Sequence, residues 1–268
     1  MTTPQTPEGA AQDTRGAGGA ATAAQYVYGV TRAGAQLPAG LTGLDDRPVT
    51  LVAHERCAAV TSDLPADRPL GARADLLAHQ KVLEALLETG TVILPFRFGA
   101  ALAAPEAVEK ELLAANADRL TQVLDGLDGR VELRVKGTYV QDAVLREVVS
   151  DDPEIAELNQ RLREVPEDAA DAAYYERVRL GEMIAQSLER RREHDGQALL
   201  EALAPAAEAL VRKPPAREED VVDAAFLVEN DRRSDFERAV QELADTHADR
   251  ITVRLIGPLP PYDFVPEA

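Results

Sequence analysis

The residues best suited to acid–base or metal chemistry are few and lie far apart in the chain. The histidines stand at positions 54, 79, 194 and 247, and the single cysteine is Cys57. His54 and Cys57 form an HxxC pair, but a zinc site needs a second pair, and none stands at ligand spacing. We therefore expect no metal ion, no cofactor and no intrachain disulfide, as suits a protein of a reducing compartment.

His79 is the histidine whose setting could serve catalysis. It follows Leu76 by three residues and precedes Leu83 by four, so it shares the apolar side of a predicted helix over residues 73–90. A catalytic base needs a nucleophile or carboxylate partner, and no GxSxG, Walker, HExxH or kinase motif supplies one. We interpret His79 as a core histidine with a satisfied ring and predict no enzyme. A hydrolase or transferase site built on His79 is the weaker alternative.

The stretch TVILPFRFGA places a cation between two aromatic rings. Pro95 cannot donate to a sheet ladder, so we expect it to end the buried strand before it. Phe96 and Phe98 then point to one face and dock on the preceding helix, while Arg97 points to the other face. We expect Arg97 to pair with a carboxylate of its own domain; direct contact with a partner is the alternative.

Composition excludes several classes of function. The chain has 268 residues and a formal net charge of -18, and its surface therefore repels nucleic-acid backbones and anionic lipid headgroups. No stretch has the length and apolarity of a transmembrane helix, and residues 1–25 do not read as a signal peptide. We expect a soluble cytoplasmic protein that binds neither nucleic acid nor a lipid membrane.

The elements that must position these residues alternate between strands and helices. Residues 1–25 are rich in Ala, Gly and Thr and are predicted to be a disordered tail, so the GAGGAA pattern within them is not a dinucleotide loop. A strand follows the tail, then two strands around a turn. We expect these elements, with the later ones, to form an N-terminal α+β domain over 26–140. Its predicted elements are a strand over 26–32, two strands within 49–64, helices over 73–90 and 105–125, and a strand over 130–140.

The second half is predicted to be a C-terminal α+β domain over 141–268 with long helices. An acidic helical segment leads into a long helix over 171–211, whose two short apolar seams flank a charged stretch. A strand over 221–230 and a helix over 234–249 follow, with Ser234 as N-cap and Glu237 completing a capping box. The final strand, ITVRLIGP, matches VELRVKG of the first half, which favours two domains with ferredoxin-like features.

Three stretches stand in a characteristic order along the chain: YVYGVTR, LLAHQKVLEALLETGTVILPFRFGA and VRLIGPLPPYDFV. Their combination resembles the gas vesicle protein family GvpF/GvpL, and the resemblance covers about residues 25–265. It implies an accessory or minor structural protein for building gas vesicles, in contact with the hydrophobic shell protein GvpA and other accessory proteins. It further implies no catalysis, no cofactor, two α+β domains and a location at the gas vesicle. The F and L branches, and incorporation in the vesicle versus assistance in building it, stay open.

The end of the chain, GPLPPYDF, is predicted to pack back over a domain. Its prolines stiffen the backbone, and Tyr262 and Phe264 offer apolar anchors. A small-molecule-binding regulatory module with paired ferredoxin-like domains is the alternative function, although no glycine-rich ligand loop supports it. The candidates for family-motif or interaction residues are His79, Pro95, Phe96, Arg97, Phe98, Gly99, Gly257, Pro258, Pro261, Tyr262 and Phe264.

Overall fold

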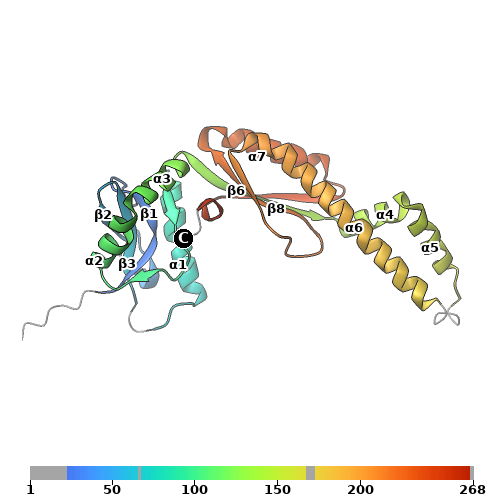
Figure 1. The fold of residues 1–268 in the computed structure, drawn as a ribbon, viewed down its shortest axis with the longest axis horizontal. Coiled ribbons are helices and arrows are strands. Elements are labelled where there is room, and N and C mark those ends of the chain that lie inside the picture. The colour runs from blue at the N-terminus through green and yellow to red at the C-terminus, as the bar shows by residue number, and fades with distance from the viewer. Residues whose placement is uncertain (1–22, 66–67, 167–172, 266–268) are drawn as a thin grey trace, which may run out of the picture.

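A computed structural model describes residues 23–65, 68–166 and 173–265, and these form an arch of mixed α+β structure (Figure 1). One antiparallel sheet with its helices makes one end of the arch, a second antiparallel sheet makes the middle, and a helical arm makes the other end. The predicted tail lies outside the described residues up to position 22, as does its GAGGAA pattern. Gln25, placed in that tail by the sequence, instead begins the first strand and is buried.

The first sheet is built around β1, which pairs with three neighbours. The strand order is β2-β3-β1-β4, and β5 also pairs with β1. A bulge between Val27 and Gly29 shifts the register, so Tyr26 and Tyr28 face one side while Val27 and Val30 face the other. The strands are β1 (Gln25–Arg32), β2 (Thr50–His54), β3 (Cys57–Asp63), β4 (Ile93–Pro95) and β5 (Ala101–Leu102).

Helices cover both faces of this sheet. On one face, α1 (Arg73–Glu88) buries Val82, Leu83 and Leu86. On the other face, α3 (Ala117–Leu127) buries its leucines in the core of the sheet, and the short α2 (Pro105–Ala107) precedes it in the chain. The segment predicted as a helix over 105–125 is helical throughout, but it is not one regular α-helix, because a π-helical segment (Val108–Leu113) and a 3-10 turn (Ala114–Asn116) lie between α2 and α3.

The second sheet has the order β7-β8-β6-β9 and is antiparallel throughout. Val131, Leu133 and Val135 point into its core, as their alternation predicts. The strand at 130–139, which was predicted to belong with the elements of the first sheet, pairs instead with later strands. The two strands read as a repeat are neighbours in one sheet, with Lys136 opposite Arg254. The strands are β6 (Arg130–Tyr139), β7 (Ala209–Arg212), β8 (Asp220–Glu229) and β9 (Ile251–Leu259).

Two helices cover one face of the second sheet, α6 (Tyr174–Leu203) and α7 (Arg233–Thr246). Gly196 lets α6 approach β8, since a Cβ there would lie 2.6 Å from the Val221 carbonyl oxygen. The predicted long helix ends earlier than expected, because residues 209–212 form β7. The predicted capping box is also wrong: α7 begins at Arg233, which pairs with Glu237.

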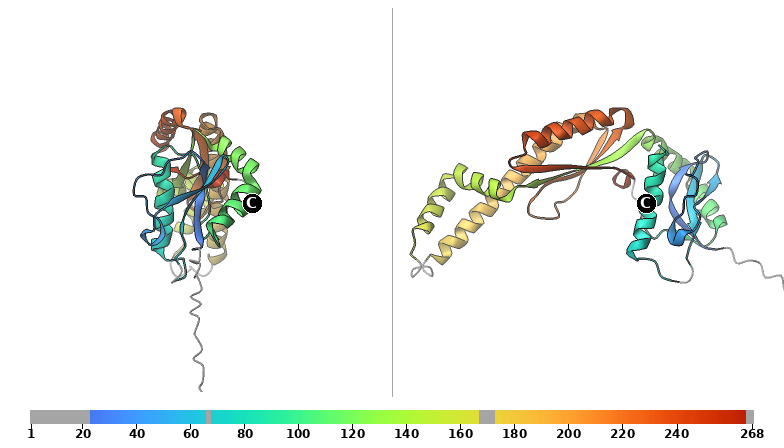
Figure 2. Two further views of the ribbon diagram at one scale, coloured as in Figure 1. Left: turned by 90° about the vertical axis from the view of Figure 1, so that its left-hand side faces the viewer. Right: turned by 180° about the vertical axis from the view of Figure 1, so that it is seen from behind.

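The helical arm consists of α4 (Gln141–Asp151), α5 (Pro153–Arg163) and the N-terminal half of α6, which projects beyond the second sheet (Figure 2). The side chain of Asp152 caps α5 by accepting from two backbone N–H groups. Leu158, Leu162 and Ala173 form a small core between α5 and α6.

Candidate functional site

The candidate residues of the chain end meet those of the first sheet. The turn Tyr262–Phe264 follows β9 and lies between the first sheet with its helices and β6 (Figure 1). Tyr262 reaches His79 on α1, 183 residues earlier in the chain. Phe264 and Val265 pack beside Leu227 of β8 against the core under α3. The expectation that the end of the chain packs back over the fold is met, and it joins the two sheets.

His79 lies at the centre of a chain of hydrogen bonds. Its Nδ1 is 2.8 Å from the Tyr26 hydroxyl, and its Nε2 is 3.0 Å from the Tyr262 hydroxyl. The Gly99 N–H donates to Tyr26, and Tyr262 donates to the Phe96 carbonyl. Each hydroxyl has one proton, so Tyr26 donates to Nδ1 and Nε2–H donates to Tyr262. We call these five residues the His79 network.

The His79 network requires a neutral imidazole. A proton on Nδ1 would face the Tyr26 oxygen, whose own hydrogen would then lose its acceptor. Burial also lowers the pKa of His79 and raises the pKa of Tyr26 and Tyr262 to about 12. The ring is therefore a satisfied core histidine whose two nitrogens hold tyrosine hydroxyls, and it has no nitrogen left for a substrate.

The two phenylalanines around Arg97 lie on opposite faces of the first sheet, which corrects the prediction of one shared face. Phe98 packs with the α1 core and meets His79 edge-on at 5.9 Å between ring centroids. Phe96 packs with the core on the α3 side. Pro95 ends β4 as predicted, and the Phe96 N–H still bonds to the Tyr28 carbonyl.

Arg97 is exposed, and no carboxylate of the described residues pairs with it, contrary to the expectation. Within residues 23–65, 68–166 and 173–265, Arg97 makes no hydrogen bond or ion pair. The anchoring of Phe96 and Phe98 on either face holds the backbone of Arg97 at the surface while leaving its guanidinium in solvent.

The glycines and prolines of the motifs shape the approach of the chain end. Gly99 and Gly257 have φ of +100° and +139°, a region that favours glycine. A Cβ on Gly257 would lie 2.9 Å from the Leu133 side chain, and the bond to Pro258 is cis. Pro258 and Pro261 line a cavity of about 250 Å³ between the end of α1 and the start of β6.

A second polar contact holds the chain end to the second sheet. Glu132 of β6 is buried and accepts a 3.1 Å hydrogen bond from the Asp263 N–H. Lys213 pairs with the Asp263 carboxylate at 2.7 Å. Burial raises the pKa of Glu132 to about 7, with the Asp263 charge adding to the effect.

The sequence reasoning missed Tyr26, Glu132, Lys213 and Asp263 as members of this junction. Glu132 carried a signal, since it is an acid between two buried residues of a Val- and Leu-rich strand. Tyr26 stands in a stretch that carried the resemblance, but only tertiary structure shows its contact with His79. His54 faces Glu109 at 3.5 Å, and Cys57 contacts the Thr121 hydroxyl.

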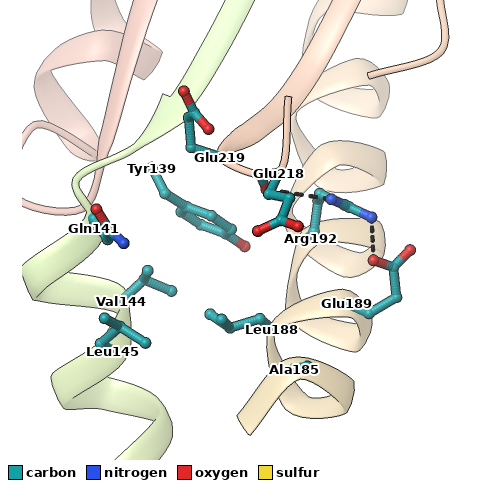
Figure 3. A pocket seen from close by; sticks show the side chains of 10 residues that line it. All are labelled: Tyr139, Gln141, Val144, Leu145, Ala185, Leu188, Glu189, Arg192, Glu218 and Glu219. Atoms are coloured by element: carbon teal, nitrogen blue, oxygen red, sulfur yellow. Dashed lines mark hydrogen bonds and ion pairs between the residues drawn. The ribbon is translucent and has the colours of Figure 1, made fainter. Parts of the chain in front are cut away.

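A cavity lies at the elbow between the arm and the second sheet (Figure 3). It measures about 550 Å³, and α4, α6 and the loop before β8 line it. The described residues contain no group of three or more His, Cys, Asp or Glu side chains placed to hold a metal ion. No helix in the described part of the chain is long and apolar enough to cross a membrane.

A sequence model of the family described as gas vesicle synthesis protein GvpL/GvpF matches residues 24–266. The chain belongs to the GvpL/GvpF family. Gas vesicle protein F of Streptomyces sp. strain CB03234 is 36% identical over 90% of this chain and 98% of its own length. Gas vesicle protein L of the same strain is 32% identical over 90% of this chain and 92% of its own length.

Solved GvpF structures share the fold. The crystal structure of GvpF from Anabaena sp. PCC7120 has a TM-score of 0.80 at 24% identity, over 92% of this chain and all of that one. GvpF from Microcystis aeruginosa gives 0.73 at 23% identity, again over 92% of this chain. Membership in the GvpL/GvpF family supports a role in gas vesicle formation, and the family is not a known enzyme family.

Proposed function

We propose that this protein acts in gas vesicle assembly by binding the shell protein GvpA and other accessory gas vesicle proteins, without catalysis. The family match over residues 24–266 supports the gas vesicle role. The His79 network supports the absence of catalysis, because its ring is fully engaged in hydrogen bonds within the fold.

The observation that carries a binding role is Arg97. Its neighbours Phe96 and Phe98 anchor the loop on both faces of the first sheet, yet Arg97 stands exposed in the part of the chain described. An exposed cation on a backbone held this firmly is preorganised for a partner carboxylate or carbonyl group. A strongly acidic protein also stays dispersed while it holds an apolar subunit that would otherwise aggregate.

We further propose that the protein has two domains with ferredoxin-like features, each made of one sheet and its helices. β6 belongs to the second domain in this proposal, because it pairs with β8 and β9. The location of the protein is then the gas vesicle and the cytoplasm in which vesicles form.

The test is co-expression with GvpA in cells lacking other gas vesicle genes, followed by pull-down. We expect GvpA to come down in soluble form with the native protein and less of it with Arg97→Ala. Arg56→Ala is the matched control, because Arg56 is also an exposed loop arginine of the first sheet. Insoluble, unbound GvpA would refute direct binding, and equal capture by Arg97→Ala and the native protein would remove Arg97 from the interface.

A further inference from the structure

Helix α6 carries two apolar seams, one on each side of the charged stretch 189–195. In its C-terminal half, Gly196, Leu199 and Leu203 are buried against the second sheet. N-terminal to the charged stretch, the second seam has apolar or small residues at a helical spacing of three and four. We call this seam the α6 stripe; it consists of Tyr174, Val178, Gly181, Ala185 and Leu188.

Within the described chain, Leu188 packs against the core of the second sheet, but the rest of the α6 stripe is exposed. Tyr174 is 61% exposed and Val178 44%, and Gly181 and Ala185 are exposed as well. The packing of the arm uses another side of the helix, where Leu180 and Met183 meet α5. The arm therefore does not need the stripe for its own core, although the stripe keeps the pattern of a packed helix surface.

The α6 stripe leads into the elbow cavity. Ala185 and Leu188 form one wall of this space of about 550 Å³, and Val144 and Leu145 of α4 form the opposite wall (Figure 3). Tyr139 lies between the walls. A cavity of this size takes one or two large apolar side chains of a helix lying along the stripe.

The elbow is held in place by ion pairs and hydrogen bonds behind the cavity. The Tyr139 hydroxyl donates to Asp195 at 2.7 Å, and Arg250 pairs with both Asp195 and Glu147. Arg191 of α6 also pairs with Glu147. These contacts join α4, α6 and β6, so the cavity walls are preorganised for a ligand.

The charges around the stripe select its occupant. Glu182 and Glu189 follow one margin, and Glu218 and Glu219 stand at the elbow. Arg192 on the cavity wall is engaged by Glu189 and the Glu218 carbonyl, and Arg217 pairs with Glu219. The carboxylates of Glu182 and Glu218 form no ion pair within the described residues, and they leave this margin with a net negative charge. A second copy of this chain, itself at -18, would bring the same acids against this margin.

We propose that the α6 stripe and the elbow cavity bind an amphipathic helix of a protein partner, with lysines or arginines along one flank of its apolar face. Its apolar side chains lie on Val178, Gly181 and Ala185, and one enters the cavity beside Leu188. Its basic flank faces the acidic margin. The inference rests on the proposed function in taking the ligand to be a protein, and it leaves open which gas vesicle protein supplies the helix.

The test uses the full chain and two synthetic helical peptides of about 15 residues, which span the roughly 22 Å of the stripe. Both carry the same leucine face; one has lysine and the other glutamate on its flank. Fluorescence anisotropy should show saturable binding of the lysine peptide, weakened by salt, and at least about tenfold weaker binding of the glutamate peptide.

Val178→Asp and Ala185→Glu should each weaken binding of the lysine peptide by at least about tenfold. Both sites are exposed, so the variants keep their fold, which circular dichroism checks. Leu77→Asp is the matched control, because Leu77 is a 54% exposed apolar residue on the distant helix α1. Equal binding of both peptides, or native affinity in the two stripe variants, overturns the proposal. Concentration-dependent dimerisation lost in Val178→Asp would assign the stripe to a second copy and also overturn it.

The outcome is separable from that of the GvpA pull-down. Capture of GvpA without binding of the lysine peptide would leave the proposed function standing and refute the docking surface. Binding of the lysine peptide without capture of GvpA would refute direct GvpA binding and keep the docking surface.

Discussion

At the scale of single residues, His79 shows how a functional-looking side chain can serve the fold. Its two nitrogens are used by Tyr26 and Tyr262, which come from the first strand and the end of the chain. Helical spacing was enough to place His79 in the core. Spacing along one helix could not identify the hydroxyls, because both partners are distant in sequence and only the packed structure brings them together.

We expect Tyr262→Phe to lower the free energy of unfolding by about 1 to 2 kcal/mol. The substitution removes the acceptor of the His79 Nε2–H and leaves a buried donor unsatisfied. Urea denaturation at neutral pH measures the change. Tyr175→Phe is the control, since Tyr175 is 83% exposed, and it should change stability by less than about 0.5 kcal/mol. Equal stability of both variants would show that the network contributes nothing.

We expect Glu132→Gln to stabilise the protein at pH 8 but not at pH 4.5. The folded pKa of Glu132, about 7, exceeds its ordinary value of 4.5, so the folded state holds this proton more tightly. The stability gained is present below pH 4.5 and is lost as the pH rises through about 7. Glutamine mimics the protonated form and avoids that loss, a gain of about 1 to 2 kcal/mol at pH 8.

Denaturation curves at the two pH values test this, with Glu208→Gln as an exposed control. A gain of the same size at both pH values would contradict the role of the carboxyl proton.

The contribution of His79 to stability depends on pH in the opposite sense. Its pKa is lowered, so its contribution is full above its usual pKa and falls as the pH drops through the folded value.

At the scale of elements, periodicity predicted most strands and helices correctly, and failed where contacts between distant segments decide. Val131, Leu133 and Val135 gave the buried face of β6, but nothing in their alternation says which sheet they join. Leu210 fitted the spacing of the long helix, yet it pairs with Phe226 in β7. Ser234 had the sequence of an N-cap, but α7 begins one residue before it.

We expect α5 and the N-terminal half of α6 to exchange amide hydrogens faster than β6 and β8. The arm core rests on Leu158, Leu162 and Ala173, whereas the second sheet packs α6 and α7 over a much larger cluster. Local opening costs less where fewer apolar groups are exposed. Hydrogen exchange with mass spectrometry compares the peptides. Equal protection would mean that arm and sheet open as one cooperative unit.

At the scale of the whole molecule, the chain end links the two sheets. Tyr262 contacts α1, Asp263 contacts β6 and Lys213, and Phe264 packs beside Leu227. The sequence showed that this proline-rich end has anchors, and so predicted that it packs on the fold. It could not show which surfaces receive the anchors, because these surfaces exist only once both sheets have formed.

We expect a chain ending after Pro258 to melt at a lower temperature and to have a larger radius of gyration. The deletion removes the contacts of the chain end with both sheets while leaving most of β9. Calorimetry and small-angle X-ray scattering measure the two quantities. The double variant Tyr262→Ala, Phe264→Ala should give the same direction of change in a full-length chain. An unchanged melting temperature and radius would refute the linking role.

The route of the chain through the second sheet has a consequence for synthesis on the ribosome. β6 is made before the arm, but its partners β8 and β9 emerge only after the arm. β6 therefore has no strand partner at either edge while α4, α5 and α6 are translated. Tyr262 follows every strand in chain order, so His79 acquires its second hydroxyl only after both sheets have been made. A nascent chain stalled before this point presents β6 edges and an open His79 pocket, which chaperones and proteases can distinguish from the finished fold.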